Sequence, residues 1–216
     1  MSRFVAASVA VALAVLPAAA RADLFSSVSV GAHAGTTGYG VSLERPLLFD
    51  FSVRVQTGTM SVSQQLSYDG NPYTTTTRYN DLALIADYHP HAGRWRISGG
   101  LVFGNDNVQN VARTEGPTLR IGNGLYSAAG AGTVISRVRY DRPSIYAGVG
   151  TGAGLIKGLA LTLDAGVLIR NGTTSASASG PLSNDPAFRA DLYRLQNEQR
   201  THVVVPALSI GLVYRP

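Results

Sequence analysis

The sequence predicts an all-β protein: an eight-stranded antiparallel up-and-down transmembrane β-barrel with a short helix in its last outer loop. Three observations support this fold class. Apolar and polar residues alternate with period two in repeated short segments, and a secretory signal precedes the first of them. The chain also has 24 glycines and only 14% charged residues, a composition poorly suited to a soluble helical enzyme. Such alternation is typical of strands that separate two different solvents, as in a membrane barrel.

Residues 1–22 predict a signal peptide, and residues 23–216 predict the outer-membrane β-barrel domain. A short basic start, "MSRF", precedes the apolar run "VAASVAVALAVLP", and Ala20-Arg21-Ala22 fits the small-residue rule for cleavage before Asp23. The apolar run is shorter than the ~20 residues that a membrane-spanning helix needs. We therefore expect export through the periplasm, and any membrane crossing in the mature chain to use strands.

Eight segments carry the alternation. The clearest is 159–170, where Leu161, Leu163 and Val167 share one face while Thr162 and Asp164 share the other. The others are 28–33, 39–44, 51–56, 82–88, 94–104, 134–150 and 204–214. In 134–150 the alternation breaks at "YDRPS", and Pro143 predicts a bulge or a change of register there because it cannot donate to a strand ladder.

The connections predict which end of the barrel faces outward. Those at 46–50, 89–94 and 151–158 are short, whereas 61–77, 105–133 and 171–200 are long and rich in polar residues or glycine. Short turns at one end and long loops at the other are typical of an outer-membrane barrel with both termini in the periplasm.

One strand alone leaves a soluble lipocalin-like barrel open as an alternative. That barrel would bury its apolar face and expose its polar face. The many Gly, Ser and Ala residues on the polar face favour a narrow interior instead.

The last long loop contains a segment with helical spacing. "SNDPAFRADLYRLQNEQR" offers Ser183 or Asn184 as the N-cap, Pro186 in the first turn and apolar residues three to four apart. We expect a short helix at the outer rim.

Charged side chains are the most informative residues in the strands. A basic side chain facing lipid at the bilayer midplane costs about 2–4 kcal/mol, so these residues are expected to face the lumen. Buried charges require partners, which predicts a network of salt bridges that fills the barrel and fixes strand register. A gated narrow path for ions or small solutes is the alternative. The predicted lumen network comprises Glu44, Arg54, Asp87, Arg96, Asp164 and Arg170.

Aromatic residues cluster near the ends of the predicted strands. Amphipathic rings favour the membrane–water interface, so they predict two girdles that a soluble barrel would lack. The predicted interface set comprises Tyr39, Tyr88, Trp95, Phe103, Tyr140 and Tyr214.

The stretch "ADYHPHAGRW" raises the question of a metal site, since Asp87, His89 and His91 alternate. The barrel interpretation separates them: Asp87 faces the lumen with Arg54 and Arg96, while Pro90 ends the strand and His91 lies in the turn. We therefore expect no metal site, no cofactor and no catalytic residue.

Three segments indicate a resemblance: "LIADYHPHAGRWRISGGLVFGND", "ASASGPLSNDPAF" and the ending "VVVPALSIGLVYRP". They resemble the small eight-stranded outer-membrane barrels, the group of the OmpA transmembrane domain, OmpW and the opacity-type proteins, and most closely an uncharacterised proteobacterial barrel family. The resemblance implies the barrel fold and the outer membrane, and says almost nothing about activity. The chain departs from the group by ending in Tyr214-Arg215-Pro216 rather than in an aromatic residue.

Three functions follow as hypotheses. The first is a monomeric, non-enzymatic scaffold that presents long outer loops, in contact with outer-membrane lipid and lipopolysaccharide and with the barrel-assembly machinery during biogenesis. The second is a narrow channel for ions or small hydrophobic solutes. The third is a lipid-modifying hydrolase, for which His33 and His202 near the outer rim are the candidates. Nucleic acid is excluded as a partner because Lys157 is the single lysine and no basic run occurs.

Overall fold

A computed structural model of the chain describes residues 28–68, 71–90, 93–112, 117–121, 124–140, 142–198 and 202–216. The predicted signal peptide at residues 1–22 and the turn residue His91 lie outside the described residues.

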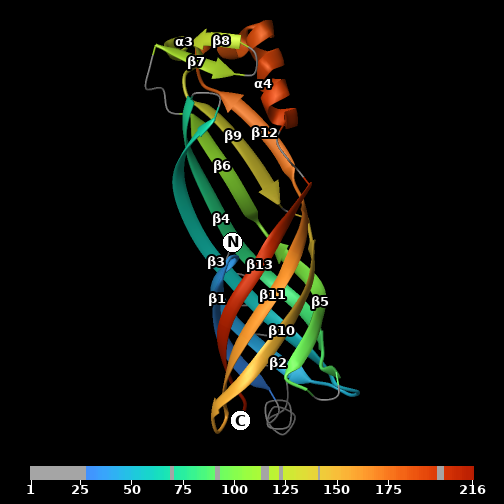
Figure 1. Ribbon diagram of the computed structural model, residues 1–216. Coiled ribbons are helices and arrows are strands. Elements are labelled where there is room, and N and C mark those ends of the chain that lie inside the picture. The colour runs from blue at the N-terminus through green and yellow to red at the C-terminus, as the bar shows by residue number, and fades with distance from the viewer. Residues whose placement is uncertain are drawn as a thin grey trace, which may run out of the picture.

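Eight strands form a closed ring of antiparallel pairs (Figure 1). Each strand pairs with its neighbour along the chain through the first five strands, and the last strand pairs with the first, which leaves no free edge in the ring. The strands of the ring are β1 (Ser29–Gly35), β2 (Gly38–Pro46), β3 (Phe51–Tyr68), β4 (Asn71–Tyr88), β5 (Trp95–Gly104), β10 (Ser144–Ile156), β11 (Leu159–Asn171) and β13 (His202–Tyr214).

The strands of the ring are strongly tilted. Following paired residues around the ring from Tyr214 of β13 leads back to β13 at Val204, ten residues away. With ordinary strand rise and spacing, this stagger corresponds to a tilt of about 40°. An eight-stranded ring of this kind leaves an interior just wide enough for side chains.

Burial alternates along the strands of the ring, and the apolar face points outward. In β13, for example, Val204, Pro206, Leu208, Ile210 and Leu212 are exposed, while the residues that alternate with them are partly or fully buried. A soluble barrel would show the opposite pattern. The exposed apolar residues therefore form a belt around the ring, and the polar face forms the lumen.

Above the ring, three strands continue the sheet on one side only. β6 (Asp106–Ala112), β9 (Val134–Tyr140) and β12 (Thr173–Ala178) extend the wall in the order β12-β9-β6-β4-β3 (Figure 1). A short interval in the sequence separates each of them from a strand of the ring. The interval is residue 105 between β5 and β6, residues 141–143 between β9 and β10, and residue 172 between β11 and β12.

The prediction of long loops is therefore corrected. Segments 61–77, 105–133 and 171–200 consist largely of strands and helices, and the single strand expected at 134–150 is two strands, β9 and β10. Each half of that segment pairs with different neighbours: β9 with β6 and β12, and β10 with β5 and β11.

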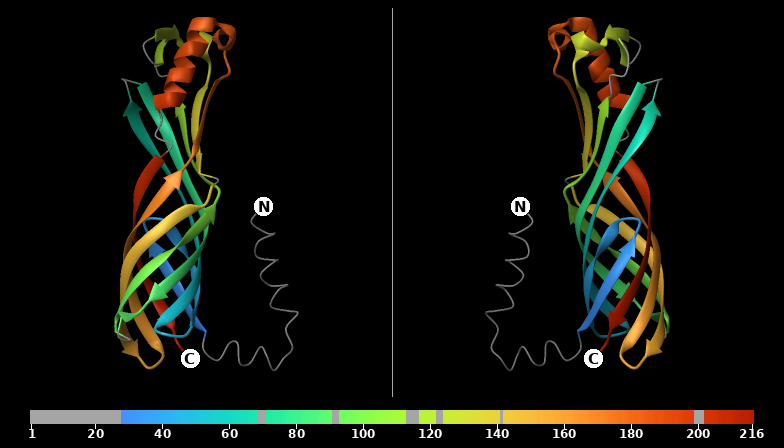
Figure 2. Two further views of the ribbon diagram at one scale, coloured as in Figure 1. Left: turned by 90° about the vertical axis from the view of Figure 1, so that its right-hand side faces the viewer. Right: turned by 90° about the vertical axis from the view of Figure 1, so that its left-hand side faces the viewer.

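A small cap packs on the far end of this extension (Figure 2). It comprises the hairpin of β7 (Thr118–Ile121) and β8 (Gly124–Ser127), the short helix α3 (Ala128–Ala131), the 3-10 helix η2 (Pro181–Asn184) and the helix α4 (Pro186–Glu198). Leu119, Ile121 and Phe188 are almost completely buried at its centre, against Tyr73 of β4 and Val134 of β9.

Helix α4 begins one residue later than an N-cap at Asn184 predicts, and two residues later than an N-cap at Ser183 predicts. The side chain of Asp185, rather than that of Ser183 or Asn184, accepts a hydrogen bond from the Phe188 backbone N–H at 2.9 Å, and Pro186 is the first helical residue. In the part of the chain that the structure describes, no helix has both the length and the apolar character needed to span a bilayer.

Candidate functional site

Four of the predicted lumen charges form one cluster in the half of the ring that carries the short turns. We call it the lower cluster. Arg54 of β3 donates to both carboxylate oxygens of Asp87 of β4, Nε to Oδ2 at 2.9 Å and Nη2 to Oδ1 at 3.2 Å. Arg96 of β5 donates to both oxygens of Asp164 of β11 at 2.7 Å. Cross-contacts of 3.6 Å between Arg54 and Asp164 and of 3.9 Å between Arg96 and Asp87 join the two pairs. The cluster therefore bridges the lumen from four strands, with equal numbers of positive and negative charges.

Neutral groups complete the hydrogen bonding of this cluster. Ser98 Oγ donates to Asp87, and the side-chain oxygen of Gln56 accepts from Arg54 Nη1 at 3.1 Å. Gly150 leaves the space that the second ion pair occupies, because a Cβ there would lie 2.5 Å from Asp164 Oδ1 and 2.7 Å from Arg96 Nε. Asp87 is fully buried, so these contacts take the place of its hydration.

Glu44 is the cross-strand neighbour of Arg54 in the register of β2 and β3, but among the described residues no ion pair joins it to an arginine. It is buried on β2, where its Oε1 accepts from Ser52 Oγ at 2.7 Å and lies 3.9 Å from His89 Nε2. The lumen charges therefore do not form the single network expected from the sequence.

Arg170 belongs to a second cluster near the outer end of the ring. Its guanidinium contacts Asp106 of β6 and lies 3.0 Å from Asp81 of β4. Its Cζ lies 5.3 Å from the centre of the Tyr79 ring and 6.0 Å from that of Tyr140. Arg170 is 1% exposed, so this cluster closes the lumen at a second level.

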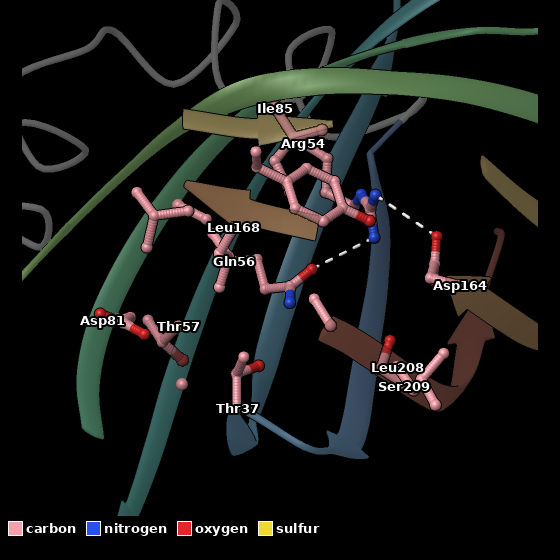
Figure 3. A pocket seen from close by; sticks show the side chains of 15 residues that line it. Thr37, Arg54, Gln56, Thr57, Asp81, Ile85, Asp164, Leu168, Leu208 and Ser209 are labelled. Atoms are coloured by element: carbon pink, nitrogen blue, oxygen red, sulfur yellow. Dashed lines mark hydrogen bonds and ion pairs between the residues drawn. The ribbon is translucent and has the colours of Figure 1, made fainter. Parts of the chain in front are cut away.

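A small cavity of about 50 Å³ lies between Arg54 and Asp164 of the first cluster and Asp81 of the second (Figure 3). Arg54, Gln56 and Asp164 line one side of it, Asp81 another, and Thr37 and Ser209 close it where the β1–β2 turn meets β13. A second cavity of about 320 Å³ lies beyond Arg170, between Tyr79, Tyr140 and residues 203–206 of β13. The chain thus fills the lumen at two levels and leaves space between and above them.

Five of the six predicted interface aromatics lie exposed on the outer surface. Tyr88, Trp95 and Tyr214 lie at the end of the ring that carries the short turns, and Tyr39 and Phe103 lie toward the other end. Phe51 packs against Tyr88 with ring centres 4.9 Å apart and belongs with them. Tyr140, in contrast, faces Arg170 inside the wall.

The histidines show no hydrolase arrangement among the described residues. His33 lies in the wall of β1 with Nδ1 buried and without a hydrogen-bond partner, and His202 Nδ1 lies 2.6 Å from Asn171 Oδ1. Among the described residues, neither side chain makes a hydrogen bond to a serine hydroxyl. The described part of the chain also contains no group of three or more histidine, aspartate or glutamate side chains that could hold a metal ion.

Asp81 and Asp106 are the lumen residues that sequence reasoning missed. Both follow the alternation of their strands: Asp81 shares the buried face of Ala83 and Asp87, and Asp106 continues the series of Arg96 and Val102 across the break at residue 105. Extending each strand by one or two residues would have identified both.

No protein-family model matches the sequence, and no curated protein matches it. Among solved structures, the chain is similar to CarO2 of Acinetobacter baumannii, with 16% identity, a TM-score of 0.63 and coverage of 88% of this chain and 98% of that chain. CarO of the same organism has 18% identity, a TM-score of 0.58 and the same coverage. A major outer membrane protein of Thermus thermophilus has 16% identity and a TM-score of 0.43, again over 88% and 98% of the two chains.

These structural neighbours are outer-membrane β-barrel proteins, and at this level of identity the similarity concerns the fold. The exposed apolar belt, the charged lumen and the closed antiparallel ring together give this chain the fold of a small outer-membrane β-barrel.

Proposed function

We propose that the protein is an integral outer-membrane β-barrel that works as a closed, non-enzymatic scaffold and holds its cap outside the cell. The observation that carries this proposal is the combination of an apolar belt with a lumen filled by ion pairs at two levels. The belt accounts for membrane insertion. The filled lumen favours a structural or interaction role over transport, because a solute would have to separate buried, paired charges on its way.

The orientation follows from the connections. The turns at residues 47–50 and 157–158 are short, and they lie at the end of the ring where β1 begins and β13 ends. The extension and the cap lie at the other end (Figure 1). Outer-membrane barrels keep their short turns in the periplasm. We therefore place the cap outside the cell, and the start of β1 and the end of β13 on the periplasmic side.

The single tryptophan tests membrane insertion directly. Trp95 is 65% exposed on the outer wall, at the start of β5 and close to the end with the short turns. In vesicles of brominated phospholipid, its fluorescence should be quenched, and more strongly by bromine near the headgroup than by bromine at the chain end. A protein whose Trp95 emission is insensitive to brominated lipid would not be inserted, and the proposal would fail.

Conductance in planar bilayers separates a closed scaffold from a channel. Reconstituted protein whose Trp95 emission is quenched by lipid should produce no defined conductance steps. Reproducible steps from inserted protein would show that the clusters around Asp87 and Arg170 open, and the channel hypothesis would then replace the scaffold.

A further inference from the structure

The outer face of the extension carries arginines that have no acidic partner among the described residues. Arg78 of β4 and Arg139 of β9 are exposed, and each directly neighbours a tyrosine, Tyr79 or Tyr140, that faces Arg170 inside the wall. Because consecutive residues in a strand point to opposite faces, Arg78 and Arg139 point away from the lumen. Neither makes an ion pair or a side-chain hydrogen bond with the described residues.

Strand register brings the two guanidinium groups to the same level. Arg78 pairs with Asn107 of β6, and Asn107 pairs with Arg139. Their backbones are therefore two strand spacings apart, about 10 Å. Arg137 precedes Arg139 by two residues in β9 and lies on the same face, on the side toward the cap. Its Nη2 donates to Gln109 at 2.9 Å, and its Nε is buried without a hydrogen-bond partner among the described residues.

The surroundings of these arginines are polar but uncharged. The outward-facing neighbours on β4, β6 and β12 are Thr76, Asn107, Gln109, Thr173 and Ser175. Across the described strands of the extension, no carboxylate faces outward, since Asp106 points inward to Arg170. This surface therefore carries positive charge with neutral hydrogen-bonding groups between the arginines.

The height of this surface relative to the apolar belt indicates what covers it. Leu82 pairs with the exposed Phe103 near the outer end of the belt. Arg78 precedes Leu82 by four residues in β4, on the side toward the cap. At the tilt of the ring, four residues correspond to a rise of about 10 Å. The arginines thus lie just beyond the hydrocarbon, at the depth of lipid headgroups rather than in bulk solvent.

We propose that Arg78, Arg137 and Arg139 form a binding surface for the phosphate groups of lipid A, the phosphorylated glycolipid of the outer leaflet. Arginine binds phosphate through paired N–H donors, and the belt below offers an apolar wall for the acyl chains. Asn107, Gln109 and Thr173 supply hydrogen-bonding groups for the sugar. This inference rests on the proposed function, because it requires the extension to lie on the outer side of the outer membrane.

The test measures binding of lipid A to the purified full-length protein in detergent, by native mass spectrometry. The test variant is Arg78→Gln/Arg139→Gln, which leaves Arg137 and its bond to Gln109 in place. The matched control is Arg45→Gln/Arg94→Gln, which removes two exposed arginines at the opposite end of the ring. We expect the test variant to bind lipid A at least about tenfold more weakly, and the control to bind like the wild type.

Two further arms identify the source of the phosphate. Lipid A without its phosphates should bind the wild type as weakly as intact lipid A binds the test variant. A large excess of inorganic phosphate should displace little lipid A, because a free anion lacks the acyl chains that lie along the belt. The inference is wrong if the test variant binds like the wild type, if the control loses as much affinity, or if inorganic phosphate displaces the lipid completely.

Quenching of Trp95 by brominated lipid keeps this inference separate from the proposed function. If both double variants insert and still bind lipid A equally, the inference fails and the scaffold proposal stands. If the wild type itself does not insert, the scaffold proposal fails first.

Discussion

At the scale of single residues, the lumen shows how a narrow barrel accommodates charge. Each buried carboxylate of the lower cluster lies within 4 Å of both arginines, and Gly150 provides the space for one of the pairs. Breaking such a cluster leaves an uncompensated charge, which costs more than the intact pair contributes. We therefore expect that replacing one member of an ion pair lowers the stability of the barrel strongly, and that replacing both members of the pair lowers it less.

Replacing the fully buried carboxylate tests this directly. Asp87→Ala should lower the free energy of unfolding by about 3–5 kcal/mol, because Arg54 loses its bidentate partner inside the wall. The measurement is urea unfolding in phospholipid vesicles, followed by Trp95 fluorescence. The double variant Arg54→Leu/Asp87→Leu should recover part of the loss. If Asp87→Ala unfolds at the wild-type urea concentration, the cluster does not hold the barrel together.

The apolar residues on the outer face of the ring should not tolerate a charged side chain. Leu163 is exposed near the middle of β11, so Leu163→Arg should destabilise the barrel by about 2–4 kcal/mol in vesicles. The control Gln64→Arg introduces the same side chain on the exposed part of β3 above the ring and should change stability little. Equal effects at the two positions would mean that Leu163 does not face lipid.

At the scale of elements, the extension and the cap are held together by a small core of their own. Phe188 of α4 is fully buried, and its ring packs edge to face on Tyr126 at 4.8 Å. The Tyr126 hydroxyl donates to Asp191 at 2.8 Å, and burial together with this bond raises the pKa of Tyr126. The cap therefore depends on contacts that the ring does not share.

This separation predicts that the cap can be loosened while the ring stays folded. Phe188→Ala should cost the cap about 3–5 kcal/mol of packing and make α4 susceptible to brief proteolysis in detergent. The ring should keep its heat-modifiable mobility on gels. Asp185→Ala removes only the N-cap of α4. It should also destabilise the cap, by about 1 kcal/mol. Loss of heat-modifiable mobility in Phe188→Ala would show that the two units fold as one.

At the scale of the whole molecule, the ring, the extension and the cap form one elongated structure with distinct surroundings at each level (Figure 2). The apolar belt surrounds only the ring, and the polar faces of β6, β9 and β12 continue beyond it. A protein with this exterior requires detergent or lipid to stay dispersed.

The molecule as a whole should therefore behave as a membrane barrel. We expect the purified protein to show β-type circular dichroism in detergent and to migrate differently on gels before and after boiling. Removal of detergent should cause aggregation through the exposed belt. A stable, water-soluble monomer would contradict the fold assignment.

The sequence by itself determined the faces of the strands, because alternation is a local property that every short segment displays. It therefore placed Arg54, Asp87, Arg96 and Asp164 in the lumen and five aromatics on the exterior. The tertiary structure decided which charges meet: Arg170 reaches Asp106 and Asp81, 64 and 89 residues away, through the stagger of the closed ring. It also decided that the long connections continue as strands, since β6, β9 and β12 are stabilised by pairing with one another and with β4. Spacing along the chain cannot specify such partners, because pairing depends on ring closure and register.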